Sequence, residues 1–171
     1  MRNQSVLIAV LALIATIAGP AVSPLAAQDR LGGNIGFVLP LVTRASGNTT
    51  TISDDFTIGF PMGITVKPSD KWAFDLELVP GVQNSPLHTS LTVHPGIIGN
   101  FGNGWGAGMR LAFDVNEPSW GFTPILNHGL FKVGKDATVF GEFVLPIRFQ
   151  SVRANETTTS VTFGVHLGIG F

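Results

Sequence analysis

Residues 161–171 read VTFGVHLGIGF, and this stretch decides the fold class. Its odd-numbered positions all carry large apolar side chains, namely Val161, Phe163, Val165, Leu167, Ile169 and Phe171. Its even-numbered positions are all small or polar. Because successive side chains of a β-strand point to opposite faces, this period of two predicts a strand with two unlike faces.

The same alternation recurs through the chain upstream of residue 161. It is clean over 56–66, 72–79 and 105–115, and less regular over 31–42, 90–101, 119–132 and 137–149. Together with 161–171, these segments predict eight antiparallel strands. Runs of Gly, Pro, Asn, Asp and Ser between the segments are typical of turns.

The composition excludes several classes of protein. Of the 171 residues, 44% are hydrophobic and only 12% are charged, which argues against a disordered chain. The formal net charge of −1 gives no electrostatic reason to expect nucleic-acid binding. The absence of cysteine excludes disulfides, thiol nucleophiles and thiolate metal sites.

The character of the second strand face decides where the apolar face points. That face is mostly Gly, Thr and Ala, which suits the inside of a narrow barrel better than contact with water. The large apolar face then needs lipid as its solvent, and only helices and closed barrels satisfy all backbone groups there. We therefore predict an all-β, eight-stranded, up-and-down transmembrane β-barrel.

The connections between the predicted strands support this topology. Short turns are expected at 67–71, 102–104 and 133–136, and generally longer, polar loops at 43–54, 83–89, 116–119 and 151–158. Short turns at one end and longer loops at the other are typical of outer-membrane barrels, where the short turns face the periplasm.

The N-terminal residues 1–27 have the pattern of a secretory signal peptide. Arg2 precedes an apolar run over 6–18, and Gly19 and Pro20 end that run before a small-residue segment up to Ala27. Cleavage after Ala27 would leave residues 28–171 as the barrel. A buried N-terminal helix is the alternative, and the polar residues from Gln28 onward argue against it.

The alternating last strand with its terminal aromatic, Phe171, resembles the small eight-stranded outer-membrane β-barrels, of the outer membrane protein A transmembrane-domain and outer membrane protein X type. The resemblance implies that residues 161–171 are the assembly signal read by the barrel-insertion machinery. It also implies a monomer in the bacterial outer membrane, with outer-membrane lipids and periplasmic chaperones as partners. Because the sequence stops at Phe171, we expect no counterpart of the periplasmic peptidoglycan-binding domain of outer membrane protein A.

Aromatic side chains at strand ends predict girdles at the membrane interfaces. Trp72 and Trp105 follow short turns, Trp120 follows a loop, and Phe171 ends the last strand. Packing inside a soluble barrel is the alternative for each tryptophan.

The inward face carries nearly all the charge that lies outside the turns and loops. The predicted interior polar network consists of Asp75, Glu77, Arg110, Asp114, Glu142, Arg148, His94 and His166. Ions held away from water must pair, so we expect a salt-bridged plug. The alternative is a gate, in which the charges exchange partners and open a narrow water path.

A small inward apolar group suggests a further role, the passage or binding of a small apolar ligand. It consists of Val38, Val79, Ile98, Val144 and Phe140. Such a ligand could enter between outer strands loosened by in-strand prolines. Those prolines are Pro40, Pro61, Pro80, Pro95, Pro124 and Pro146, which we interpret as bulges or frayed ends near the outer rim. Misplaced strand boundaries would be the simpler explanation.

An enzyme that modifies lipid A is the remaining alternative. Its candidate residues are His88 and Ser90, with Asp54 and Asp55 in the first loop. One His two residues from one Ser is common by chance, so we expect no catalytic residues. The four histidines show no metal-ligand spacing, and we expect neither a metal nor a cofactor.

Overall fold

The computed structural model describes residues 30–84, 86–153 and 156–171, without the side chains of residues 152 and 153. The chain divides into two compact units, Met1–Arg30 and Leu31–Phe171, and the fold below is that of the second unit. The predicted signal peptide at 1–27 lies outside the described residues. No helix long and apolar enough to cross a membrane occurs among the described residues.

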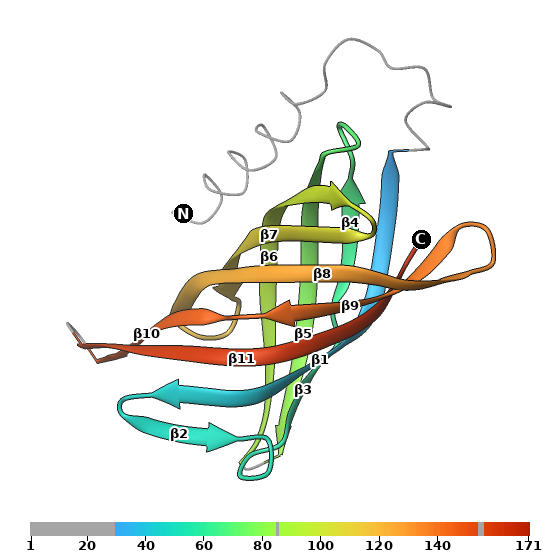
Figure 1. Ribbon diagram of the computed structural model, residues 1–171. Coiled ribbons are helices and arrows are strands. Elements are labelled where there is room, and N and C mark those ends of the chain that lie inside the picture. The colour runs from blue at the N-terminus through green and yellow to red at the C-terminus, as the bar shows by residue number, and fades with distance from the viewer. Residues whose placement is uncertain (1–29, 85, 154–155) are drawn as a thin grey trace. The chain divides into compact units, whose positions relative to one another are not determined.

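The second unit consists of antiparallel β-strands (Figure 1). In chain order they are β1 Leu31–Ala45, β2 Asn48–Thr51, β3 Thr57–Gly59, β4 Met62–Val66, β5 Trp72–Asn84, β6 Leu87–Gly102, β7 Trp105–Asp114, β8 Ser119–Val133, β9 Ala137–Val144, β10 Ile147–Arg153 and β11 Glu156–Gly170. If β2 to β4 count as one interrupted passage and β9 with β10 as another, the strands make eight passages.

The sheet closes into a ring because the last strand pairs with the first. The ladder between β1 and β11 runs from Asn34 opposite Gly170 to Ala45 opposite Ser160. The other ladders join passages that follow one another along the chain. This up-and-down connectivity confirms the predicted all-β barrel.

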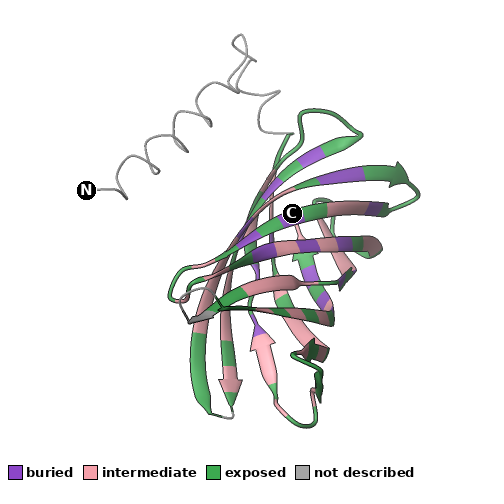
Figure 2. Cartoon of the chain, turned by 90° about the vertical axis from the view of Figure 1, so that its left-hand side faces the viewer, coloured by how far each residue is buried: buried purple, intermediate pink, exposed green. Residues whose placement is uncertain are grey.

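Buried and exposed residues alternate along several strands (Figure 2). Most of the large apolar residues are exposed, whereas a set of charged residues is buried. Along β5, Phe74 and Leu76 are 42% and 43% exposed, whereas Asp75 and Glu77 are 4% and 1% exposed. The same inversion holds in the neighbouring strands, and the buried apolar core is small, formed by Ala73, Ile98, Ile125 and Val144. The sequence pattern assigned the two faces correctly.

At one end of the barrel the strands are joined by short turns. Positive φ angles occur at Gly102 (89°), Asn103 (53°) and Gly104 (78°) between β6 and β7, and at Gly134 (68°) between β8 and β9. At this end β4 pairs with both β1 and β5, so the wall is complete around the ring. We call it the turn end.

At the opposite end, the predicted loop at 116–119 is confirmed, because β7 ends at Asp114 and β8 begins at Ser119. The other three predicted loops are wrong in extent, because the strands continue through most of each. β1 extends to Ala45 and forms a hairpin with β2 through Ser46 and Gly47. β5 and β6 stay paired as far as Asn84 opposite Leu87, and β10 and β11 as far as Arg153 opposite Glu156. These extensions were missed because their polar residues show no alternation in hydrophobicity, although their backbones pair. We call this the hairpin end.

Three of the six prolines interrupt the ladder as predicted. The register between β1 and β11 shifts between Pro40 and Val42. Pro61 lies between β3 and β4, and Pro146 lies between β9 and β10. Pro80, Pro95 and Pro124 form no bulge, because each keeps a partner across a ladder without a register shift. On its other side, however, Pro95 lies in a gap of the β6–β7 ladder, which has no pair between Val93–Phe113 and Gly96–Arg110.

The ring is less complete at the hairpin end. Among the described residues β2 pairs only with β1, and β3 joins β1 through a single residue pair, Val38 with Gly59. The outer edge of β2, which faces away from β1, is therefore an unpaired sheet edge.

Candidate functional site: a charged cluster across the lumen

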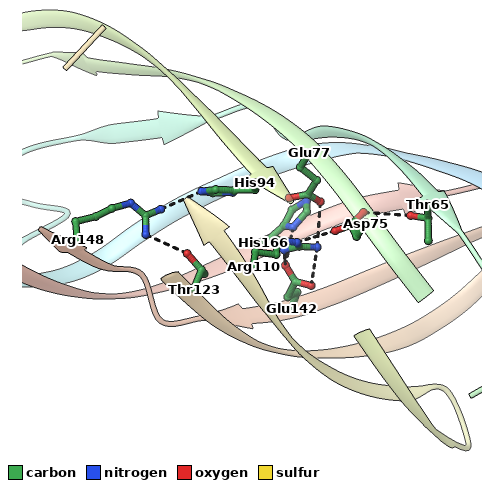
Figure 3. Close-up of polar contacts among 9 residues, drawn as sticks. All are labelled: Thr65, Asp75, Glu77, His94, Arg110, Thr123, Glu142, Arg148 and His166. Atoms are coloured by element: carbon green, nitrogen blue, oxygen red, sulfur yellow. Dashed lines mark hydrogen bonds and ion pairs between the residues drawn. The ribbon is translucent and has the colours of Figure 1, made fainter. Parts of the chain in front are cut away.

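Arg110 lies at the centre of a buried ionic cluster (Figure 3). Its Nε lies 2.7 Å from Asp75 Oδ2 and its Nη1 lies 2.7 Å from Glu142 Oε1. Its Nη2 lies 3.1 Å from Glu77 Oε1. One guanidinium thus holds carboxylates from two other strands, β5 and β9.

The alternation of each strand points these side chains into the lumen. Asp75 and Glu77 are two residues apart on β5 and therefore share a face. Register brings Glu142 of β9 opposite His166 of β11. Arg110 fits because its ladder partner on β6 is Gly96, where a Cβ would stand 2.5 Å from Arg110 Cγ.

His166 completes the cluster from β11. Its Nδ1 lies 3.2 Å from Glu142 Oε1, and its ring meets Phe140 edge-on with centroids 5.0 Å apart. Its Nε2 has no hydrogen-bond partner among the described residues. Glu77 Oε1 likewise has no hydrogen bond, although it is in ion-pair contact with Arg110.

The remaining predicted network residues lie nearer the hairpin end. Arg148 Nη2 lies 3.0 Å from His94 Nε2, and Arg148 Nη1 donates to Thr123 Oγ1 at 3.1 Å. Asp114 accepts a 2.6 Å hydrogen bond from Thr92 Oγ1. The eight predicted residues are therefore distributed over three places, with five of them in the Arg110 cluster.

The Arg110 cluster separates two cavities in the lumen. One has a volume of about 430 Å³ and extends from rim residues Lys67 and Asp136 to Asp75, Arg110 and Glu142. We call it the turn-side chamber, because both rim residues adjoin short turns. The other, the hairpin-side chamber, has about 120 Å³ and is lined by Glu77, Arg110 and Glu142 together with Pro40, Pro61 and Pro146. Arg110 and Glu142 line both chambers and so form the partition between them.

Sequence reasoning missed several polar residues of the turn-side chamber. Asn34 is buried in β1, and Asn100 and Asn127 line the same chamber. Thr65 lies deeper and donates a 3.2 Å hydrogen bond to Asp75 Oδ1. Asn34 could have been found from its even-numbered position, since it shares the inward face of β1 with Gly32 and Gly36.

The predicted girdle residues all lie on the outside of the barrel. Trp72, Trp105, Trp120 and Phe171 are exposed. Trp105 stacks on His128 at 4.3 Å between ring centroids, and Trp120 lies 4.9 Å from Phe149.

The predicted assembly strand forms part of β11, at the seam of the ring. The residues of its apolar face are Val161, Phe163, Val165, Leu167, Ile169 and Phe171, and all of them except the half-buried Val165 are exposed. Phe171 exchanges two backbone hydrogen bonds with Gly33, at 2.7 and 2.9 Å. Its ring covers Gly33, where a Cβ would stand 2.9 Å from Phe171 Cε2.

Three of the four candidate catalytic residues, His88, Asp54 and Asp55, are engaged in other contacts. His88 Nε2 pairs with Glu117 Oε1 at 2.8 Å. Asp54 accepts hydrogen bonds from the backbone N–H and the hydroxyl of Thr51, and Asp55 accepts one from Gln83. Within the described residues, no group of three or more His, Asp or Glu side chains is arranged to hold a metal ion.

No family model and no curated protein matches the sequence. Among solved structures, the crystal structure of the outer membrane protein OprG from Pseudomonas aeruginosa is similar, with a TM-score of 0.44, 12% identity, and coverage of 82% of this chain and 94% of that one. A de novo designed transmembrane β-barrel gives a TM-score of 0.34 at 14% identity, covering 80% and 94% of the two chains. The specific resemblance to the outer membrane protein A and X type stays a prediction.

Proposed function

We propose that this chain is a small, monomeric β-barrel of the bacterial outer membrane, with a structural or surface-interaction role and a lumen closed by the Arg110 cluster. One observation carries the proposal, the inverted distribution of side chains. Large apolar residues are exposed on strands all round the ring, including Ile35, Leu76, Met109, Phe143 and Leu167. Soluble monomers rarely expose apolar surface of that extent, whereas a lipid solvent requires it.

The cluster supports a closed lumen. Arg110, Asp75, Glu77 and Glu142 have side chains only 0–4% exposed, and they span the barrel from β5 to β9. A buried ion pair in good geometry resists separation, because separating it strands charges in a medium that solvates them poorly. We therefore propose a plug role for the cluster, and we keep the expectation that the protein is not an enzyme as a prediction.

Two measurements test this proposal. The mature chain is refolded into lipid vesicles, and insertion is followed by heat-dependent migration on a detergent gel and by protease protection. The inserted protein is then placed in a planar bilayer. We expect insertion without a stable open conductance state. A stable channel would contradict the plug, and failure to insert would contradict the membrane assignment.

A second candidate function is the binding or passage of a small apolar ligand at the hairpin end. Three prolines, Pro40, Pro61 and Pro146, line the hairpin-side chamber together with Val38 and Val144. Each of these prolines sits at a bulge or strand break, and β2 offers an unpaired edge nearby. Lipid or detergent retained inside the purified barrel, detected by native mass spectrometry, would favour this candidate over a purely structural one.

We also propose assembly partners for this chain on the basis of β11. Its outward apolar face and its pairing with β1 at the seam support β11 as the segment presented to the barrel-insertion machinery, with periplasmic chaperones acting before insertion. Replacing Phe171 with Ala should lower the amount of inserted protein in cells more than its refolding yield in vitro. Equal losses in the two measurements would instead indicate a role for Phe171 in stability alone.

A further inference from the structure

The Arg110 cluster is not electrically balanced. It contains three carboxylates, Asp75, Glu77 and Glu142, but a single guanidinium. The carboxylates of the cluster therefore outnumber its guanidinium by two. Arg148 lines the hairpin-side chamber together with Glu77 and Glu142, but it does not line the turn-side chamber. Because buried carboxylates are costly without nearby positive charge, a further positive group on the turn side of the cluster would be favourable.

The turn-side chamber gives such a group access to the cluster. Asp75 and Glu142 form part of its floor, and its rim is formed partly by residues of the short turns. Its volume of about 430 Å³ falls within the range of small-ligand sites. A small solute entering at the turn end would therefore meet carboxylate groups at the bottom of the chamber.

Asn34 supplies an independent sign of a ligand site. Its side chain is only 8% exposed, it lines the turn-side chamber, and its Oδ1 has no hydrogen-bond partner among the described residues. The amide lies over the inward face of Gly63, where a Cβ would stand 3.2 Å from Asn34 Oδ1. A buried acceptor without a donor is costly, so a ligand carrying N–H groups would be stabilised there.

From this geometry we propose that the turn-side chamber binds a small organic ammonium ion, such as a diamine, from the aqueous phase at the turn end. The inference goes beyond the structural role proposed above. Ammonium groups match the floor carboxylates and donate to Asn34 of β1, and the amide side chains of Asn100 of β6 and Asn127 of β8 line the same chamber from other strands. The Phe140 ring also lines the chamber and can interact with a cation through its face.

The lining favours an organic cation over a metal ion. Metal sites need several oxygen ligands converging within a short radius. Here the acceptors are spread along a chamber, and the described residues contain no cluster with metal-ligand geometry. An elongated diamine can place one ammonium group at the floor and the other near Asp136 at the rim.

Calorimetric titration of the refolded chain in detergent micelles tests the proposal, with putrescine as the probe and 1,4-butanediol as its uncharged analogue. We expect saturable binding of putrescine to one site, weakened by salt. Since the floor recognises charge, 1,4-butanediol should bind at least about tenfold more weakly. Comparable binding of the two compounds, or no saturable putrescine binding by a properly folded barrel, overturns the proposal.

Matched variants at the rim locate the site. Asp136→Asn should weaken putrescine binding about two- to fivefold, as expected for an exposed ion pair, whereas Asp70→Asn should not change it. Lys67→Gln should tighten binding by a similar factor, because it removes a like charge, whereas Lys71→Gln should have no effect. Asp70 and Lys71 lie in the turn between β4 and β5 but are not among the residues that line the chamber.

Asn34→Ala tests the floor of the site and should weaken binding about fivefold through loss of one hydrogen bond. Each variant is first checked for heat-dependent migration on a detergent gel. If the wild-type chain does not form a detergent-stable barrel, the result argues against the proposed function. A chain that folds but binds putrescine equally well in the wild type, Asn34→Ala and Asp136→Asn argues against the ammonium site alone.

Discussion

The two ends of the barrel differ in how completely their strands are paired around the ring. At the turn end, β4 pairs along its whole length with β1 on one side and β5 on the other, and the lumen is a wide polar chamber. At the hairpin end, prolines shift or break three ladders, β2 has a free edge, and the lumen is narrow. The Arg110 cluster lies at the boundary of the two halves.

The difference shows how a proline affects the hydrogen bonding of a closed barrel wall. A proline loses its N–H donor but keeps its carbonyl acceptor. Pro61 accepts from Gly36 at 2.9 Å, Pro124 from Leu145 at 3.0 Å, and Pro146 from Thr162 at 2.8 Å. Prolines therefore alter the register of this wall without removing every bond across it. We infer that the hairpin end is less rigid than the turn end, and four predictions test that comparison.

The largest effect is expected at the boundary between the halves. Arg110→Met leaves three buried carboxylates without their cation and should lower the free energy of unfolding by about 3–5 kcal/mol. Arg148→Met removes a less buried cation of the hairpin end and should cost clearly less. Urea unfolding of the two refolded variants, followed by tryptophan fluorescence, gives both values. Equal losses would mean that the Arg110 cluster has no special part in stability.

The seam of the ring is the next test. A Cβ at Gly36 would overlap the carbonyl oxygen of Leu167 on the neighbouring strand, which is backbone and cannot move aside. Gly36→Ala should therefore destabilise the barrel by about 1–3 kcal/mol. Gly141→Ala is the matched control, because its Cβ would find its nearest neighbour, a Leu130 methyl, at an ordinary 3.6 Å. A neutral Gly36→Ala would mean that the seam is looser than described.

Backbone amide exchange compares the rigidity of the two ends directly. Amides of β2 that point away from β1 should exchange with solvent more than about tenfold faster than the amides of β4. The reason is that β4 is paired on both sides, with β1 and β5, whereas β2 is paired with β1 alone among the described residues. Residue-resolved exchange by NMR in micelles measures this ratio. Uniform protection of both ends would contradict the interpretation of a loosened hairpin end.

The smallest effect concerns the first connection at the hairpin end. The pKa of Asp54 is lowered below its usual 3.8, because the backbone N–H and then the hydroxyl of Thr51 donate to its carboxylate. The stabilisation exists above the unfolded-state pKa and is lost as the pH falls through the lowered value. NMR titration should show that Thr51→Val raises the Asp54 pKa toward 3.8. An unchanged titration would mean that the hydroxyl contributes nothing.

The sequence predicted the side-chain faces better than the strand ends. Alternation over 72–79 fixes which residues of β5 face inward, because a period of two leaves no other choice. The alternation also predicted that charged residues such as Asp75 and Glu77 are buried inside the barrel. It could not predict that Arg110 pairs with Asp75 and Glu142 while Arg148 lies beside His94, because those contacts depend on the stagger between strands.

The hairpin end was harder to predict for a different reason. In Asn48–Thr51 both strand faces are polar, so the pattern resembles a loop although its backbone pairs with β1. The turn-side chamber was missed too, because its lining comes from separate strands and turns. Asn34 and Asp136 are far apart in sequence, and only the barrel curvature brings them to one cavity.

The contact between Gly33 and Phe171 has a consequence for how quickly the barrel forms. Hairpins between consecutive strands can form from local chain segments, but the β1–β11 ladder joins opposite ends of the described chain. Such distant pairing carries the largest loop-closure entropy and slows folding. Until that ladder forms, the first and last strands both have open edges, so the period of greatest aggregation risk lasts until this single step is complete.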